Sequence, residues 1–203
     1  MNGKKYELTT ETKVVFGRTL YRIRALIAFS NVDAGELGGW IEKESNLAQD
    51  GNAWVYGDAW VYGDARVYGD ARVSGNARVS CNAWVYGNAW VSGNAWVYGN
   101  AWVYGDAWVY GNALVSGNAW VSGDARVVKP VHLLTIGAIG SRNGCTTFFR
   151  TKDKQIKVSC GCFLGTIAEF AEKVKQTHGD SKHAKTYAIA IELAKAQIED
   201  VEG

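Results

Sequence analysis

The residues of this sequence best suited to chemistry are tryptophan, tyrosine and arginine side chains that recur every six residues between positions 51 and 127. The chain has nine Trp, and all but one of them lie in this stretch. Aromatic rings stack on nucleobases or sugars, while Arg pairs with phosphate or carboxylate groups. This mixture suits a nucleotide-like ligand or an anionic glycan. The same side chains could instead pack against another copy of the chain, because large exposed apolar patches usually mark interaction sites.

A second group of candidates combines the thiols of Cys160 and Cys162 with the imidazoles of His178 and His183, which are zinc-ligand types. Residues two apart in a strand face the same side, so both thiolates could reach one ion. However, C-x-C departs from the usual C-x₂₋₄-C spacing, and a hairpin strand here favours small buried thiols. We therefore expect no metal and no cofactor.

The element that must position the aromatic side chains is a six-residue unit, G-[ND]-A-[WR]-V-[YS], which runs from Gly51 to Val127 with Cys81 and Leu114 as the main exceptions. A β-branched Val in every unit predicts order rather than a disordered linker. Alternation along a strand places Ala and Val on one face and Trp/Arg and Tyr/Ser on the other. Gly and Asn/Asp form the corner, because both tolerate the left-handed backbone region.

Three such units make a triangular coil of 18 residues, so the repeats predict about four coils spaced by roughly 4.8 Å. Positions 18 apart then stack on the same face of the triangle. The first face carries Trp54, Arg72, Trp90, Trp108 and Arg126; the second carries Trp60, Arg78, Trp96 and Leu114; the third carries Arg66, Trp84, Trp102 and Trp120. The third face is the most aromatic and adjoins a column of Tyr68, Tyr86, Tyr104 and Ser122.

The flanks predict two further regions, so the expected domains are an N-terminal β cap over 1–50, the repeats over 51–128 and a small α+β module over 129–203. In the cap, 4–28 reads as two or three strands, and Trp40–Ile41 imitates the Trp–Val step of the repeats. Caps of this kind cover the open end of a repeat array. In the module we expect a hairpin over 145–160 that turns at 152–154. Two helices follow, one capped by Thr166 and Glu169 and ending at Gly179, the other over about 181–198.

The repeat pattern V-x-G-[ND]-A-x resembles the hexapeptide repeat of the left-handed β-helix family. The chain as a whole is similar to a family of uncharacterised function, the hexapeptide-repeat proteins of phages and prophages. The segments that carry this similarity are GRTLYRIRAL (17–26), DAGELGGWIE (33–42), the GDARV repeats, LLTIGAIGSR (133–142) and VSCGCFLGT…EF…THGD (158–180). The N-terminal block also resembles enterobacterial proteins described as acetyltransferases. The resemblance implies a left-handed parallel β-helix that assembles as a homotrimer, and a bacterial host cell as the setting.

Acyl transfer is the activity that hexapeptide-repeat enzymes imply, and those enzymes use a general-base histidine in or beside the coils. The three histidines of this chain are His132, His178 and His183, and none of them lies in the repeats. No long loop interrupts the coils to form an acceptor pocket either. We therefore expect a protein that is not an enzyme, with an acyltransferase kept as an alternative.

Composition narrows the choice of partner. The formal net charge is +2, which argues against duplex nucleic acid held by bulk charge. The sequence has neither a signal peptide nor an apolar run of membrane-spanning length, which predicts a cytoplasmic protein. We expect a non-catalytic oligomeric binding protein, a phage counter-defence factor that sequesters a nucleotide-like signal; a purely structural scaffold is the main alternative. The expected ligand-binding or interface residues are Arg66, Trp84, Tyr86, Trp102, Tyr104, Trp120, Arg72 and Arg78.

Overall fold

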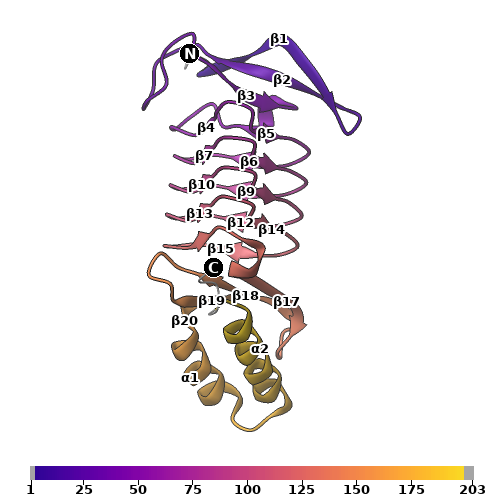
Figure 1. Cartoon of the computed structure of the whole chain (residues 1–203), viewed down its shortest axis with the longest axis vertical. Helices are drawn as coiled ribbons and strands as arrows, with labels where there is room; N and C mark the ends of the chain where they lie inside the picture. Colours follow the sequence, from indigo (N-terminus) through magenta and orange to yellow (C-terminus); the bar gives the residue numbers. More distant parts are fainter. Residues whose placement is uncertain (1–2, 199–203) are drawn as a thin grey trace.

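A parallel β-solenoid forms the body of the molecule, with an N-terminal cap on one end and a C-terminal module on the other (Figure 1). The computed structural model describes residues 3–198. The predicted fold class, a mainly β parallel solenoid with a C-terminal α+β module, is confirmed. One face alone stacks a 5-stranded sheet, so the solenoid has about five turns rather than the four expected from the repeats.

The additional turn starts within the segment expected to be only a cap. The cap contains β1 (Tyr6–Val15), β2 (Arg18–Ala25), β3 (Leu37–Ile41) and the 3-10 turn η1 (Glu44–Asn46). Strands β1, β2 and β3 pair antiparallel, but β3 also pairs in parallel with the first strand of the second face, Trp40 opposite Trp60. Leu47 forms a bridge with Val67 in the same way. Residues 38–49 therefore build a partial first turn, because Trp40–Ile41 repeats the Trp–Val step.

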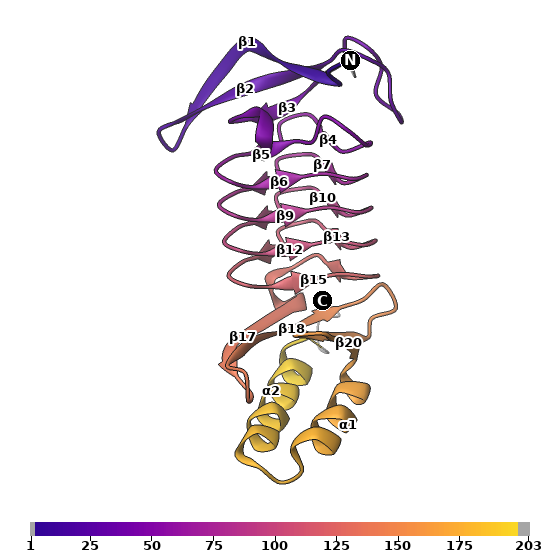
Figure 2. The ribbon, with the colours of Figure 1, turned by 180° about the vertical axis from the view of Figure 1, so that it is seen from behind.

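Short strands at six-residue intervals build the turns (Figures 1 and 2). They are β4 (Trp54–Val55), β5 (Trp60–Val61), β6 (Arg66–Val67), β7 (Arg72–Val73), β8 (Arg78–Val79), β9 (Trp84–Val85), β10 (Trp90–Val91), β11 (Trp96–Val97), β12 (Trp102–Val103), β13 (Trp108–Val109), β14 (Leu114–Val115), β15 (Trp120–Val121) and β16 (Arg126–Val127). Their hydrogen-bonded order is β4-β7-β10-β13-β16 on the first face, β5-β8-β11-β14 on the second and β6-β9-β12-β15 on the third. These are the three predicted columns, in the predicted register.

The solenoid interior consists of the alanines and valines of the repeats, each of which is at most 1% exposed. Backbone hydrogen bonds run from turn to turn; the Trp84 N–H, for example, donates to the Ala101 carbonyl at 2.9 Å. Strands within the stack therefore have their backbone groups satisfied by the turns above and below, which a stack of turns achieves without long strands.

The corners separate the roles of glycine and of Asn/Asp. The repeat glycines have φ between 57° and 73°, whereas no described Asn or Asp of the repeats has a positive φ. The expectation that both positions share the left-handed backbone is therefore wrong: only the glycine position takes that conformation, including Cys81, which replaces glycine in one repeat. The Asn and Asp side chains instead hydrogen-bond along the solenoid axis; Asn82 Nδ2 donates to Asn100 Oδ1 at 3.0 Å, and Asn100 Nδ2 to Asn118 Oδ1 at 3.0 Å.

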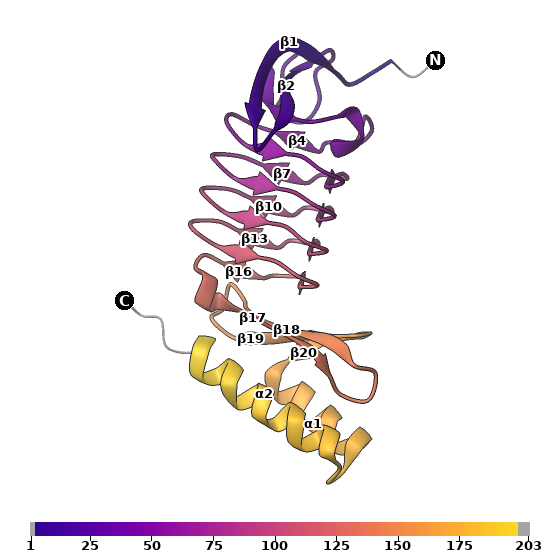
Figure 3. The same cartoon turned by 90° about the vertical axis from the view of Figure 1, so that its right-hand side faces the viewer.

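The C-terminal module is an antiparallel sheet that closes the last turn and carries two helices on its outer side (Figure 3). After the 3-10 turn η2 (Pro130–His132), the sheet contains β17 (Leu133–Ile139), β18 (Gly144–Arg150), β19 (Ile156–Cys160) and β20 (Phe163–Thr166), followed by α1 (Ile167–His178) and α2 (Lys182–Ile198). The predicted hairpin is β18–β19, and the predicted capping box of Thr166 and Glu169 starts α1. Neither described helix has the length and apolar composition needed to span a bilayer.

Candidate ligand-binding cavity

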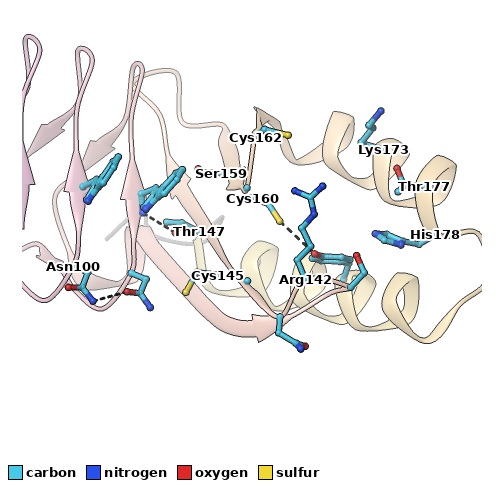
Figure 4. Close-up of a pocket in the computed structure, with 18 residues that line it drawn as sticks. Asn100, Arg142, Cys145, Thr147, Ser159, Cys160, Cys162, Lys173, Thr177 and His178 are labelled. Atoms are coloured by element: carbon cyan, nitrogen blue, oxygen red, sulfur yellow. Dashed lines mark hydrogen bonds between the residues drawn. The ribbon is translucent and has the colours of Figure 1, made fainter.

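A cavity of about 740 Å³ lies where the third face of the solenoid meets the C-terminal module (Figure 4). Its volume falls in the range typical of small-molecule sites, roughly 300–1,000 Å³. The solenoid supplies Asn100, Trp102, Asn118 and Trp120; the β17–β18 loop supplies Ser141, Arg142 and Asn143; the sheet supplies Thr147, Ser159 and Cys160; and the helices supply Lys173, Thr177, His178 and Tyr187. One wall is therefore aromatic and periodic, and the other is polar and irregular.

The solenoid wall is made of two ladders that run along the third face. The indoles of Trp84, Trp102 and Trp120 stack with centroids 5.2 Å apart and ring planes within 8° of parallel. Beside them runs the amide ladder that ends in Asn100 and Asn118. Both ladders follow from the 18-residue period, because the same residue type recurs at the same corner of each turn. The wall is rigid and presents flat rings with amide groups at their edge.

The module wall is positioned by α1 and α2. Lys173 and Thr177 lie on the same side of α1, since residues four apart share a helix face, and His178 follows Thr177 in the lining. The His178 ring stacks on Tyr187 of α2, with centroids 5.8 Å apart. Tyr187 in turn packs on Gly140, whose φ is +75° and where an added Cβ would lie 1.8 Å from the tyrosine oxygen. Glycine is thus required at this point of the β17–β18 loop to admit the tyrosine.

Tyr187 and Cys160 form a polar contact inside the module wall. The Cys160 Sγ lies 3.7 Å from the Tyr187 hydroxyl and accepts a hydrogen bond from Thr146 Oγ1 at 3.2 Å. Burial, and then the neighbouring thiol, raise the pKa of Tyr187 to about 12, against the opposing effect of the Arg142 charge. Tyr187 therefore stays a neutral hydroxyl over the physiological range.

The charge of the cavity is positive on the module side. Arg142 and Lys173 are exposed side chains of the wall, and in Figure 4 Arg142 reaches from its loop into the space beside Cys160, facing α1. No described residue forms an ion pair with either of them, and no Asp or Glu contributes to the lining. Two unpaired cations without a carboxylate make a site that attracts an anion.

The two walls are held together by direct bonds between the last turn and the sheet. The Trp120 N–H donates to Thr147 Oγ1 at 3.1 Å, and Lys157 Nζ lies 2.7 Å from Asp124 Oδ1. Phe149 is fully buried and belongs to the solenoid core rather than to that of the module. The sheet therefore extends the last turn of the solenoid.

The comparisons with known proteins concern the repeats. A profile described as the YdcK beta-solenoid repeat matches overlapping segments from residue 65 to residue 123. The repeats are similar to the YdcK beta-solenoid repeats. A protein of Escherichia coli (strain K12) named "Uncharacterized acetyltransferase YdcK" is 51% identical over 37 residues, which are 18% of this chain and 11% of that protein. The profile match ends at the solenoid, before the module wall of the cavity.

The YdcK-like repeats do not bring the predicted site residues to one place. Trp102 and Trp120 line the cavity, and Trp84 is the next rung away from it. Tyr86 and Tyr104 stack in the neighbouring column at 5.0 Å, outside the lining. These placements divide the predicted aromatic set between the cavity wall and the adjoining outer surface.

The repeat arginines predicted as ligand or interface groups lie away from the cavity. Arg78 is sandwiched between Trp60 and Trp96, 4.4 and 4.9 Å from their ring centroids, and Arg66 lies 5.6 Å from that of Trp84. Arg72 pairs within the first face. Arg66 and Arg78 act as rungs of the aromatic ladders by cation–π contact. The cationic residues of the cavity, Arg142 and Lys173, were not predicted, because their chemistry appears only when the loop and α1 meet.

The zinc hypothesis rested on a strand that the structure interrupts. Gly161 has φ +58° and forms the turn between β19 and β20, so Cys160 and Cys162 do not share one strand face. Cys162 is exposed, and the expectation that both thiols are buried is wrong for it. Within residues 3–198, no group of three His, Cys, Asp or Glu side chains could hold a metal ion.

His132 is buried at the junction of the solenoid and the module. Its Nδ1 accepts the Val128 N–H at 3.3 Å, and Arg150 Nη1 lies 3.3 Å from its Nε2. Burial, then the positive charges of Arg150 and Lys129, lower the pKa of His132. These contacts make it a neutral structural residue. His178 is the histidine that lines the cavity.

Proposed function

We propose that this chain is a non-catalytic binding protein that holds a small nucleotide-like anion in the cavity between the third face and the C-terminal module. The observation that carries the proposal is that the two walls of the cavity differ in chemistry. Stacked indoles form one wall, and Arg142 and Lys173 stand on the other without a carboxylate. An aromatic wall suits a nucleobase, while exposed guanidinium and ammonium groups suit phosphate.

The direct test compares binding of AMP, GMP, CMP and UMP by calorimetry to the whole chain and to the double variant Arg142→Gln/Lys173→Gln. Hydrogen bonds to charged groups contribute roughly 1.5–3 kcal/mol each, so loss of both cations should weaken binding ~100-fold or more. The matched control is Lys182→Gln/Lys185→Gln, which removes two exposed charges from α2 outside the cavity. Failure of all four nucleotides to bind, or equal loss in both double variants, would contradict the proposal.

Self-association is proposed for the solenoid surfaces that the cavity does not use. Trp96 and Leu114 are adjacent on the second face and each is 37% exposed, while Trp108 on the first face is 40% exposed. Contact between chains would remove this apolar surface from water at ~25 cal/mol per Å². We expect a homotrimer in sedimentation equilibrium. Replacing Trp96 with Ser should dissociate it, and a monomeric parent protein would refute this part of the proposal.

The biological use that we propose, from the resemblance to phage proteins, is sequestration of a nucleotide signal in an infected bacterial cell. Sequestration requires that the ligand be released unchanged. Native mass spectrometry of protein purified from infected cells should therefore show a nucleotide adduct, and denaturation should return the same intact nucleotide. A hydrolysed or transferred product would instead indicate an enzyme.

Acyl transfer is the second candidate, because His178 lines the cavity and the E. coli relative is named an acetyltransferase. A histidine in a nucleotide-sized site could act as general base toward an acceptor. Acetyl-CoA turnover that is lost in His178→Gln would favour this candidate over the binding protein. A scaffold without any ligand is favoured if neither nucleotides nor acetyl-CoA bind.

A further inference from the structure

The indole ladder of the third face stops at the cavity, and no further aromatic rung follows its last ring, Trp120. Continuing the 18-residue period past Trp120 would place residue 138 on the next rung. The chain has left the solenoid by then, through η2, and Ala138 lies in β17. Trp120 is 36% exposed, one of its ring faces is covered by Trp102, and no other described aromatic ring lies against it. Its second face is therefore directed toward the module and the cavity.

The other ends of the three Trp/Arg columns are closed. At the start of the first face, Trp54 is fully buried under Tyr6 and Phe29, whose ring centroids lie 6.0 and 5.4 Å away. At its end, the guanidinium of Arg126 lies 4.2 Å from the ring centroid of Trp108.

The second and third faces show the same pattern. At the start of the second face, Trp40 is only 6% exposed, and Lys13 and Arg22 lie 4.0 and 5.2 Å from its ring centroid. At the end of that face, Leu114 follows Trp96 as the last rung. Arg66 covers Trp84 at the start of the third face. Among the described residues, Trp120 is thus the end of a column that no cation, ring or aliphatic rung covers.

The amide ladder beside it is open at the same point. Asn118 accepts a hydrogen bond from Asn100, and no described residue accepts one from Asn118 Nδ2. Each of the two amides before it in this ladder donates to the next. The ladder therefore presents an amide N–H donor to the cavity, at the edge of the position that a ring stacked on Trp120 would occupy.

We propose that the nucleobase of the ligand is the missing rung of both ladders. Its ring stacks on Trp120, an acceptor on its edge receives the Asn118 Nδ2–H, and its phosphate points toward Arg142 and Lys173. This proposal rests on the proposed function and adds the orientation and the part of the ligand that is recognised. A planar heterocycle with an edge acceptor satisfies both open groups, whereas a sugar phosphate alone has no aromatic ring to continue the indole ladder.

The experiment uses ribose 5-phosphate as a probe that keeps the sugar and phosphate but lacks the base. Calorimetry on the whole chain should show that AMP, GMP, CMP or UMP binds more tightly than ribose 5-phosphate. Trp120→Leu should weaken the binding of whichever nucleotide binds the parent chain by roughly 5-fold to 150-fold, the range for loss of one base–aromatic stack. The affinity of the Trp120→Leu variant for ribose 5-phosphate should stay within twofold of that of the parent chain.

Matched variants control for folding. Trp84→Leu changes the same ladder two rungs away from Trp120 and outside the cavity lining, and Leu114 shows that the solenoid accommodates leucine on a rung. Asn118→Asp keeps the acceptor for Asn100 and removes the open donor; Asp70 and Asp106 already accept from Asn rungs elsewhere. Asn112→Asp makes the same change where another amide ladder ends, outside the cavity lining.

The outcomes separate the two proposals. If ribose 5-phosphate binds as tightly as every nucleotide, or if Trp120→Leu weakens both probes equally, the ring inference is wrong and the anion site stands. If neither kind of probe binds, the proposed function itself fails. Selective loss of the nucleotide in Trp120→Leu and Asn118→Asp, with Trp84→Leu and Asn112→Asp within twofold of the parent, supports the inference.

Discussion

Replacing Cys81 with glycine should stabilise the solenoid. Cys81 stands at a corner that glycine occupies in the neighbouring repeats, and its φ is +60°. L-residues with a side chain pay roughly 1–2 kcal/mol in the left-handed region. Glycine avoids that cost, but its greater conformational freedom stabilises the unfolded chain and offsets roughly 0.4–1 kcal/mol of the gain. The thiol is exposed, so little buried contact is lost. The expected net gain is about 1 kcal/mol.

The measurement is the urea midpoint followed by circular dichroism, with the reciprocal variant Gly87→Cys as the partner experiment. Gly87 has φ +68°, and a Cβ there would lie 3.0 Å from the Gly105 nitrogen. Gly87→Cys should therefore lower the free energy of unfolding by at least the ~1–2 kcal/mol of the left-handed conformation. The reasoning would be refuted if Cys81→Gly lowered the midpoint, or if Gly87→Cys left it unchanged. Because repeat arrays can unfold in parts, the midpoints are compared rather than a single two-state free energy.

Three further predictions concern the module and its junction. Gly140→Ala should destabilise the module by more than ~1–2 kcal/mol, because φ is positive and the new Cβ would meet the Tyr187 oxygen; Tyr187→Phe should recover part of that loss in a thermal melt. The lowered pKa of His132 means that the unfolded chain takes up a proton first as the pH falls. Stability should therefore decrease below about pH 6.5 and not above it, and His132→Gln should remove that part of the pH dependence. Thr166→Ala removes the N-cap of α1 and should cost about 1 kcal/mol in the melting of the module, with no change in the β signal of the solenoid.

The periodic part of the fold could be predicted because each of its features is repeated many times. Alternation and an 18-residue period placed every Ala and Val inside and assigned each Trp to its face, and the structure has the same register. The role of the Asn/Asp position was mistaken, because two residue types were assigned to one corner conformation. An 18-residue spacing also stacks those side chains, as at Asn82 and Asn100, and that consequence could have been drawn from the sequence.

The irregular part of the site could not be predicted. Arg142, Lys173 and Tyr187 are far apart in the sequence, and they meet because β17 and β18 turn at Gly140 and the two helices pack on the sheet. No period relates these positions, and exposed cations on a loop and a helix are ordinary surface residues when read singly. Residues 128–203 carry eleven basic and eight acidic side chains, and this mild positive excess gives no location.

The end of the repeats is also where a selective site is physically most reasonable. Along the solenoid each rung has the same neighbours as the next, so a ligand bound to the outer surface would find several equivalent positions and no defined register. Translation along the axis ends at Trp120 and Asn118, where ring and amide have a neighbour on one side only. The module then adds charges that occur once, Arg142 and Lys173, beside a surface that is otherwise repeated. A ligand that must touch both the last rung and these cations has one position available. If the chain binds the proposed ligand, specificity therefore comes from the interruption of the repeat, and variants at the last rung should affect binding more than the same changes anywhere else in the ladders.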